Sequence, residues 1–595
     1  MDIIQRSIYA MNHFMINNPE LTPRGYRDYF TIRPFPYPSA THNQWDDGDG
    51  TSRALDAWIY LRKITGDVYT GREVEEGQWK YLKSLIDPRN GLIFVGDHSN
   101  IAASRAYYHL WDQGRTLRHL INRYQFIVAN ESEKYAIEAL IVKMIEGVNR
   151  LSSCAKLENG RAARYWVYDA YWNDMPIPGG MEFGPYNFMN FTMGNAQLLE
   201  PAVQWAAITS DHTVLEWAMQ LAEGFIAGLE TRRESTSPMF GDNGQFNGHF
   251  HCVVSGLTGT VHLAKELCSI GNISDCHRFL DITIKAYRWI FSEDNLNRGG
   301  SHGWFPENSG KETSPTSEIC CTADMIEFAA ALASMAFIVP GYDYLDDLWD
   351  DVDRFALNEL FSMQVLKAEH LRSYVNLRDI DKFDEVAKLY DGGWPFGHNW
   401  PHDLMGFKLM NRQVGDQADK SSLNNCACEM NIGGCCLYSG PRGFYGYWNA
   451  MIKEAGDTIE IRFSGRYRSA AIDINTIQDG GFSYTLNKPR KILARIPKTA
   501  DASSIRVLCC GKEVPFVYEK TMMRIIIDSV ENIQYQIFWQ DISWTSIETL
   551  GMENNGHIKG CPIGSRVTFR LEYQGNKLVR ISPSEYAYLP LIDGL

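Results

Sequence analysis

The chain has 595 residues, of which 45% are hydrophobic and 22% are charged, as in an ordinary globular protein rather than a disordered or membrane-embedded one. Its length exceeds that of a typical domain, so a large body with at least one accessory domain is expected. The formal net charge of -15 and the lack of a Lys/Arg run argue against nucleic acid as a partner, because a phosphate backbone needs a basic face.

The N-terminal segment, MDIIQRSIYAMNHFMINNPELTP, lacks a basic start, a long apolar run and a small-residue cleavage site. We therefore expect no signal peptide and a cytoplasmic location. No stretch is apolar for long enough to span a membrane, so no membrane partner is expected. The 13 cysteines of such a chain are expected to be mostly free thiols or metal ligands.

Amphipathic segments of helical period recur up to about Ala450, separated by short breaks rich in Gly, Asn, Asp and Pro. Representative segments are 52–66, 132–151, 196–210, 212–229, 276–291 and 317–337. With weaker candidates they amount to roughly a dozen helices, or about six helical hairpins. This number predicts an (α/α)6 barrel, although the period alone does not establish that the ring closes.

After 453–458 the sequence changes to short alternating segments such as IEIRFSG, KILARIP and SIRVLCCG. Strand period with turn-like joints is typical of a β-sandwich. The chain is therefore predicted to be mainly α with a β accessory region. An (α/α)6-barrel catalytic domain spans 1–454 and a β-sandwich accessory region spans 455–595.

Two segments of the sequence are rich in cysteine, namely 316–324 (TSEICCTAD) and 425–436 (NCACEMNIGGCC). Zinc takes four ligands, among which thiolates are favoured and a carboxylate is accepted. A Zn²⁺ site made of Glu318, one of the pair Cys320/Cys321, Cys435 and Cys436 satisfies that number. The two glycines before Cys435 allow the tight backbone that would direct both adjacent sulfurs to one ion.

The choice between Cys320 and Cys321 stays open at this point. In a regular helix Glu318 shares a face with Cys321, whereas a helix that begins at a Ser317 N-cap leaves its first turn irregular. Cys426 and Cys428 are second-choice ligands because they lie close to Cys435 in sequence. The alternative for all of them is a set of buried thiols that act as small apolar groups, since the CxxC spacing is missing.

The Glu318-Ile319-Cys320 motif followed by the pair Cys435-Cys436 resembles the DUF1680 or glycoside hydrolase family 127 enzymes, the β-L-arabinofuranosidases. The resemblance extends to the segments 196–211, 247–267 with its Gly-His pair, and 490–516, which is predicted to form strands. It implies a retaining glycosidase on an (α/α)6 barrel, in which zinc is held by a glutamate and three cysteines. The substrate would be a small oligosaccharide or glycoside with a terminal furanose, which this resemblance makes β-L-arabinofuranose. Whether the chain forms a homo-oligomer stays open.

Carried over by position, the resemblance makes Glu318, Cys320 and Cys436 zinc ligands and Cys435 both a ligand and the nucleophile. A metal keeps a thiol deprotonated at neutral pH, and a thiolate can attack an anomeric carbon. This role would explain why two cysteines stand side by side.

A retaining mechanism also needs a general acid/base. The family has His-Gly-Glu upstream of its Glu-x-Cys, whereas this chain has His302, Gly303 and Trp304. Glu307 is the nearest replacement for the missing glutamate, and Glu312 is a poorer one. The alternative for both is a solvated loop glutamate.

Candidate substrate contacts follow from the same resemblance. Gln197 replaces an expected histidine and still offers hydrogen bonds, and His249 matches the Gly-His position. His302 and Trp304 are further candidates. In the stretch 42–53, Trp45 offers a stacking face and Asp46, Asp47 and Asp49 offer acceptors, although an acidic turn that caps the helix is the favoured explanation of this stretch.

Two rival functions remain open. The first is an inverting hydrolase or a sugar lyase that uses carboxylates such as Asp46 or Asp49, with zinc in a structural role. The second is a non-catalytic carbohydrate-binding protein that keeps the metal site without the acid, as Trp304 suggests.

Overall fold

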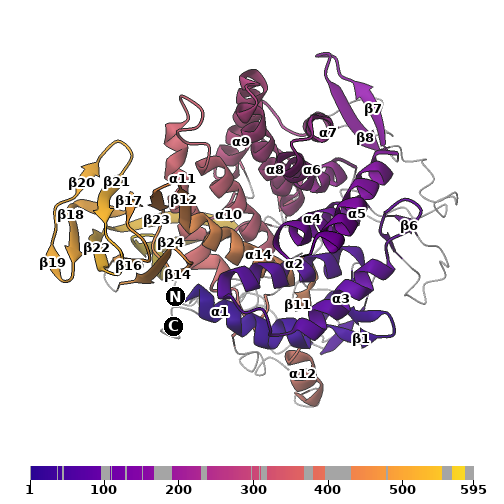
Figure 1. Ribbon diagram of the computed structural model, residues 1–595, viewed down its shortest axis with the longest axis horizontal. Helices are drawn as coiled ribbons and strands as arrows, with labels where there is room; N and C mark the ends of the chain where they lie inside the picture. Colours follow the sequence, from indigo (N-terminus) through magenta and orange to yellow (C-terminus); the bar gives the residue numbers. More distant parts are fainter. Residues whose placement is uncertain are drawn as a thin grey trace.

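The computed structural model, shown in Figure 1, describes residues 2–35, 38–42, 46–95, 107–108, 110–127, 130–150, 152–166, 191–228, 238–295, 298–306, 308–309, 318–366, 380–394, 430–477, 480–551 and 566–582. Glu307, Glu312, Trp45, Cys426 and Cys428 lie outside these residues. The predictions made for them therefore stay predictions.

An inner ring of helices forms the centre of the N-terminal part. Its members are α2 (Gly48–Thr65), α4 (Leu110–Phe126), α6 (Phe191–Thr209), α8 (Phe250–Ser269), α10 (Ile319–Ala333) and α14 (Gly434–Met451). Each packs against the next, and α14 packs back against α2. The ring is therefore closed.

An outer layer surrounds this ring. It consists of α1 (Ile3–Ala10), α3 (Arg72–Ser84), α5 (Glu131–Arg150), α7 (His212–Ala227), α9 (Ile273–Ile290) and α11 (Leu348–Phe355). The helices α3, α5, α7, α9 and α11 each pack on the inner helix that precedes them, and α1 contacts α2 and α14. The arrangement is an (α/α)6 barrel, as predicted.

The sequences of the two layers differ as their burial requires. The inner helix α10, ICCTADMIEFAAALA, is buried on nearly every side, and a helix that is apolar all round belongs in a core. The outer helix α9 buries only one stripe, which includes Cys276, Phe279, Leu280 and Thr283. Asp211 caps the start of α7 by accepting a hydrogen bond from the Thr213 N–H at 2.8 Å.

Short strands and turns join the helices. The pairs are β1 (Glu20–Thr22) with β2 (Gly25–Arg27), β5 (Phe94–Val95) with β6 (Tyr107–Tyr108), β7 (Ser152–Lys156) with β8 (Ala162–Trp166), and β9 (Gly248–His249) with β10 (Asn308–Ser309). A three-stranded sheet has the order β11 (Met430–Gly433), β3 (Thr31–Phe35), β4 (Ser39–Thr41). The remaining pieces are a π-helix at Met11–Met15, a 3-10 helix at Asp343–Asp347, a π-helix at Ala356–Leu360 and α12 (Ile380–Ala387). Among the described residues, no helix has the length and hydrophobicity needed to cross a membrane.

The β-rich C-terminal region lies on one side of the barrel, drawn in orange to yellow in Figure 1. One sheet has the order β12 (Ile452–Ala455), β13 (Thr458–Ile461), β17 (Arg490–Arg495), β21 (Arg524–Ser529), β20 (Val517–Glu519). A second has the order β14 (Tyr467–Arg468), β15 (Ile472–Thr476), β16 (Gly481–Leu486), β22 (Gln534–Asp541), β18 (Ala500–Cys509), β19 (Lys512–Glu513). A third consists of β23 (Ser543–Gly551), β24 (Arg566–Gln574) and β25 (Lys577–Ser582). The first strand, β12, follows α14 directly, close to the predicted division at residues 454 and 455, which itself stays a prediction.

Buried ion pairs join the barrel to the first β-sheet. Arg495 donates to Asp350 at 2.7 Å, and Arg524 donates to both oxygens of Asp346 at 2.9 Å. We call these four residues the interface charge cluster. Bidentate and charge-assisted hydrogen bonds of this kind are the stronger ones in proteins, so they fix the geometry of the junction.

Candidate metal centre

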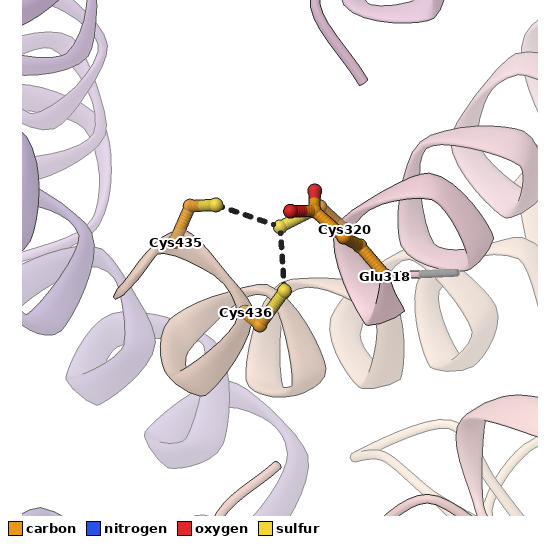
Figure 2. Close-up of side chains that lie close together, drawn as sticks. All are labelled: Glu318, Cys320, Cys435 and Cys436. Carbon is orange, nitrogen blue, oxygen red and sulfur yellow. Dashed lines mark hydrogen bonds between the residues drawn. The ribbon is translucent and has the colours of Figure 1, made fainter. Parts of the chain in front are cut away.

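Four potential metal ligands meet where α10 and α14 begin. Figure 2 shows the side chains of Glu318, Cys320, Cys435 and Cys436 pointing toward one another from these two helix starts. The Cys320 sulfur lies 3.1 Å from that of Cys435 and 3.2 Å from that of Cys436. One ligand atom from each residue lies within 4.8 Å of the others. We call these residues the four-ligand site.

The backbone around Gly434 explains how two adjacent cysteines reach one place. Gly434 has a φ of 63°, a conformation that glycine adopts without strain. Its N–H donates to the carbonyl oxygen of Phe30, and the preceding Gly433 pairs with Thr31 of β3. The chain thus turns sharply from β11 into α14, so that Cys435 and Cys436 occupy the first turn of the helix.

Glu318 precedes α10 instead of belonging to it. Its φ of -123° and ψ of 142° are extended, and it occupies the N-cap position. Because of this extended residue, Glu318 and Cys320 point the same way, and Cys320 rather than Cys321 belongs to the four-ligand site. The sulfur-bearing residues lie in first helical turns, where the positive end of the helix dipole favours a thiolate.

Without a metal, the three thiols share their protons unequally. Burial raises the pKa of Cys320, but hydrogen bonds with Cys435 and Cys436 outweigh it and lower this pKa to about 6. The hydrogen bond with Cys320, together with burial, raises the pKa of Cys435 above its usual value. Burial and the bonds with the other two thiols raise that of Cys436. A metal that binds all three sulfurs therefore has to displace protons from the thiols whose pKa is raised.

The donor set fits a thiophilic divalent metal. Three thiolates and one carboxylate give the coordination number and the ligand softness that Zn²⁺ accepts in proteins. All four residues are buried, so competing water is kept away. The structure thus supports a metal site at this place, and the nature of the metal is part of the proposal below.

The structure places His249 beside the four-ligand site. Its Nε2 lies 3.9 Å from the nearer carboxylate oxygen of Glu318. As the last residue of β9 it pairs with Asn308 of β10.

Gln197 is buried on α6 and packs against Gly114 of α4. Its Nε2 has no hydrogen-bond partner among the described residues, which leaves a donor for a ligand.

The other candidates for substrate contacts lie elsewhere. His302 is buried, and its Nδ1 lies 3.9 Å from a carboxylate oxygen of Glu548 in β23. Trp304 is half-buried, and its carbonyl oxygen accepts from the Gly300 N–H at 2.7 Å. The structure thus orients His302 toward the third β-sheet, and a role in substrate binding stays a prediction for both.

The acidic residues before and within α2 are held by protein groups. Asp46 and Asp47 lie 3.2 and 3.3 Å from Arg27, and the Tyr81 hydroxyl donates to Asp47 at 2.6 Å. Such contacts agree with the structural reading of this stretch. They also weaken the rival in which Asp46 acts as a free catalytic carboxylate.

A network that sequence reasoning missed fills the barrel axis next to the four-ligand site. Arg53 donates to Asp49 at 2.6 Å, and both Arg53 and Arg115 lie 3.1 Å from Nε2 of His251. Nδ1 of His251 contacts Asp324. We call Asp49, Arg53, Arg115, His251 and Asp324 the axial charge cluster. The pair Asp49/Arg53 has helical i, i+4 spacing, which was the available signal, but His251 is 198 residues from Arg53.

Burial sets the charge states in this cluster. It lowers the pKa of His251 well below the usual value, so the imidazole is neutral and accepts at Nε2 while Nδ1–H donates to Asp324. Burial and the neighbouring Arg53 and Arg442 lower the pKa of Arg115 to about 9. Burial opposes the charge of Arg53, but the Asp49 carboxylate and the sulfurs of Cys435 and Cys320 raise its pKa above the usual value.

Comparisons with known proteins concern the fold. No protein-family model matches the chain, and no curated protein matches it. Among solved structures, the GH127 β-arabinofuranosidase BT3674 matches with 13% identity, 97% coverage of this chain, 81% coverage of that chain and a TM-score of 0.50. Ara127N, a GH127 β-L-arabinofuranosidase from Geobacillus stearothermophilus T6, matches with 11% identity, coverages of 90% and 77%, and a TM-score of 0.52. A structure described as a glycoside hydrolase matches with 10% identity, coverages of 95% and 84%, and a TM-score of 0.52. The chain therefore shares the fold of these enzymes, as the sequence resemblance implied.

Proposed function

We propose that the chain is a zinc-dependent retaining glycoside hydrolase that releases a terminal furanose from small oligosaccharides, with Cys435 as the nucleophile. The substrate proposed first is a β-L-arabinofuranoside. One observation carries the proposal: Glu318, Cys320, Cys435 and Cys436 converge, buried, in a chain with the fold of family 127 β-L-arabinofuranosidases.

The four-ligand site would hold zinc through the Glu318 carboxylate and the three sulfurs. Zinc, when bound, supplies the positive charge that keeps these thiols deprotonated at neutral pH. Cys435 is 8% exposed, whereas Cys320 and Cys436 are fully buried. This exposure supports Cys435 as the thiolate that a sugar can reach.

In the proposed cycle, the Cys435 sulfur attacks the anomeric carbon, and the bond from that carbon to the leaving oxygen breaks. A carboxyl group, for which we propose Glu307, gives its proton to that oxygen. The resulting carboxylate then takes a proton from water, whose oxygen replaces the sulfur on the anomeric carbon. Two displacements return the original stereochemistry, so the product is released with retention.

The remaining candidates would orient the sugar. His249 lies beside Glu318, and Gln197 offers an amide donor. Asn308, which follows Glu307 in the chain, pairs with His249. This pairing supports the choice of Glu307, and we retain Trp45, His302 and Trp304 as proposed sugar contacts.

The test combines metal analysis with product stereochemistry. Zinc content of the purified protein is measured, and hydrolysis of a panel of aryl furanosides is followed by proton NMR. We expect about one zinc per chain and a product released with retention. Glu307→Gln should slow turnover of substrates with poor leaving groups more than that of activated aryl glycosides. Inversion, or full activity of the metal-free enzyme, would contradict the proposal.

A second function deserves the same assay because Trp304 stands where the related enzymes have a glutamate. Binding of furanosides without turnover by the wild-type protein would favour a carbohydrate-binding protein. A cytoplasmic location and a homo-oligomeric state remain predictions.

A further inference from the structure

The charge next to the four-ligand site is unbalanced. Two guanidinium groups, those of Arg53 and Arg115, share the Asp49 carboxylate at 2.6 and 3.8 Å. Both also contact Nε2 of His251 at 3.1 Å, and this nitrogen carries no charge because it accepts. Two cations thus face one carboxylate, so this part of the axis carries one net positive charge.

Farther along the axis the balance reverses. Arg442 donates to Asp324 at 2.6 Å and also to Glu327. Arg118 lies 2.9 Å from Glu200 and 3.4 Å from Glu327, so two cations face three carboxylates there. Among these guanidinium and carboxylate groups, the surplus positive charge therefore lies at the end of the axis where the inner helices begin.

Contacts of Arg53 lead directly to the cysteines. One of its NH groups donates to the Ser439 hydroxyl at 3.3 Å. Ser439 follows Cys435 by four residues and Cys436 by three in α14, so the three side chains share a face, about 5–6 Å apart from turn to turn. The Arg53 guanidinium thus lies roughly one helical turn from the sulfurs.

A filled four-ligand site needs such a cation. Three thiolates and one carboxylate around a divalent metal leave a charge of minus two in a buried place. An uncompensated charge in a protein interior is costly. No protein cation could bind the sulfurs directly without competing with the metal. The negative charge therefore has to be compensated by a cationic side chain that lies beyond the ligands.

We propose that Arg53, fixed by Asp49, His251 and Ser439, is the positioning residue whose charge compensates the anionic ligands and thereby sets the affinity of this site for a thiophilic divalent metal. The inference rests on the metal site of the proposed function and deepens it. It assigns the axial charge cluster a task in metal binding in addition to packing.

The test measures zinc affinity by competition with a chromophoric chelator, for full-length protein stripped of metal. Outer-shell partners of metal sites typically contribute 10- to 100-fold in affinity. Arg53→Gln should therefore weaken zinc binding by about tenfold or more. Arg53→Lys restores the charge without the planar fork and should recover a large part of the loss. Arg118→Gln, the matched control, removes another buried guanidinium from the axis farther from the sulfurs and should change affinity by less than about threefold.

Circular dichroism and thermal unfolding of each metal-free variant show whether it folds. If Arg53→Gln does not fold, Asp49→Asn tests the same idea with the opposite sign. The isosteric amide oxygen still accepts the hydrogen bond that fixes Arg53, but the negative charge beside Arg53 is gone, so zinc binding should tighten. Three outcomes would overturn this inference but leave the proposed function standing. The first is equal zinc affinity of the wild type and Arg53→Gln, and the second is an equal loss of affinity in Arg53→Gln and Arg118→Gln. The third is weaker zinc binding by Asp49→Asn. A wild-type protein that binds no zinc would overturn the proposed function as well, which keeps the two failures distinct.

Discussion

Two buried polar clusters in this molecule are built in opposite ways. In the interface charge cluster, each carboxylate of Asp346 and Asp350 contacts a guanidinium of Arg495 or Arg524. In the four-ligand site, groups of one kind gather: each of the four becomes an anion when it loses a proton. Opposite charges that meet in a core stabilise a junction, whereas like groups that meet there require a further cation. The contrast separates a cluster that fixes a junction from one whose donors could hold a metal ion.

The largest expected effect concerns the reactive thiol. Cys435→Ser removes the nucleophile and one ligand, so turnover should fall by at least about 10³-fold while the far-UV circular dichroism spectrum stays unchanged. Initial rates on an aryl β-L-arabinofuranoside provide the measurement. The control is Cys252→Ala, which alters a buried thiol on α8 outside the four-ligand site and should keep most of the activity. Normal rates in Cys435→Ser would remove the thiolate mechanism.

The interface should behave in the opposite manner. Arg495→Gln leaves Asp350 buried without its cation, and removing one partner of a buried pair costs about 3–5 kcal/mol. Urea unfolding should show this loss, with zinc affinity unchanged. Arg506→Gln, an exposed arginine on β18, is the control and should cost less than about 0.5 kcal/mol. A large change in zinc affinity for Arg495→Gln would break the comparison between the two clusters.

One interface carboxylate is held by neutral groups and should respond to pH. Asp353 accepts from the Tyr447 hydroxyl at 3.0 Å and from the Asn576 amide at 2.9 Å, and burial raises its pKa from 3.8 to about 6. A raised carboxyl pKa favours the folded state below the unfolded value, and this contribution is lost as the pH rises through the folded value. A shift of about two units corresponds to about 3 kcal/mol.

The free energy of unfolding of the wild type should therefore fall by about 3 kcal/mol relative to Asp353→Asn between about pH 3 and pH 7. The difference between the two proteins matters, because other titrating groups contribute equally to both. A constant difference across this range would show that Asp353 is ionised normally. Asp353 would then behave like Asp346 and Asp350, the two ion-paired carboxylates of the interface charge cluster.

Metal binding should give the smallest of these effects on stability. At zinc about hundredfold above its dissociation constant, the folded state gains about 2.7 kcal/mol, seen as a higher melting temperature. Cys320→Ser should lose this gain, and Cys321→Ser, its neighbour outside the four-ligand site, should keep it. The reverse pattern would show that Cys321 is the ligand.

The elements of the barrel could be predicted from the sequence, and its closure could not. The buried stripe of α9 has clear helical spacing, and the strand period after α14 marks the β-rich region. Closure depends on contacts of α14 with α2, which are nearly 400 residues apart in sequence. Periodicity within one segment contains no information about such a contact.

The ligand residues could be named from motif and resemblance, but the choice of Cys320 could not be made from helix geometry. A regular helix pairs Glu318 with Cys321, and the extended backbone at Glu318 changes that relation. The axial charge cluster was missed because its members come from different inner helices. His251 is 136 residues from Arg115 and 73 from Asp324, so their meeting is a property of the closed ring.

The order in which the chain is synthesised gives the four-ligand site a further property. Cys320 and Cys435 are separated by 115 residues, and α14 is the helix that completes the inner ring. A nascent chain that lacks α14 presents only half of the four donors. A metal held as we propose could therefore be loaded only after the barrel has closed.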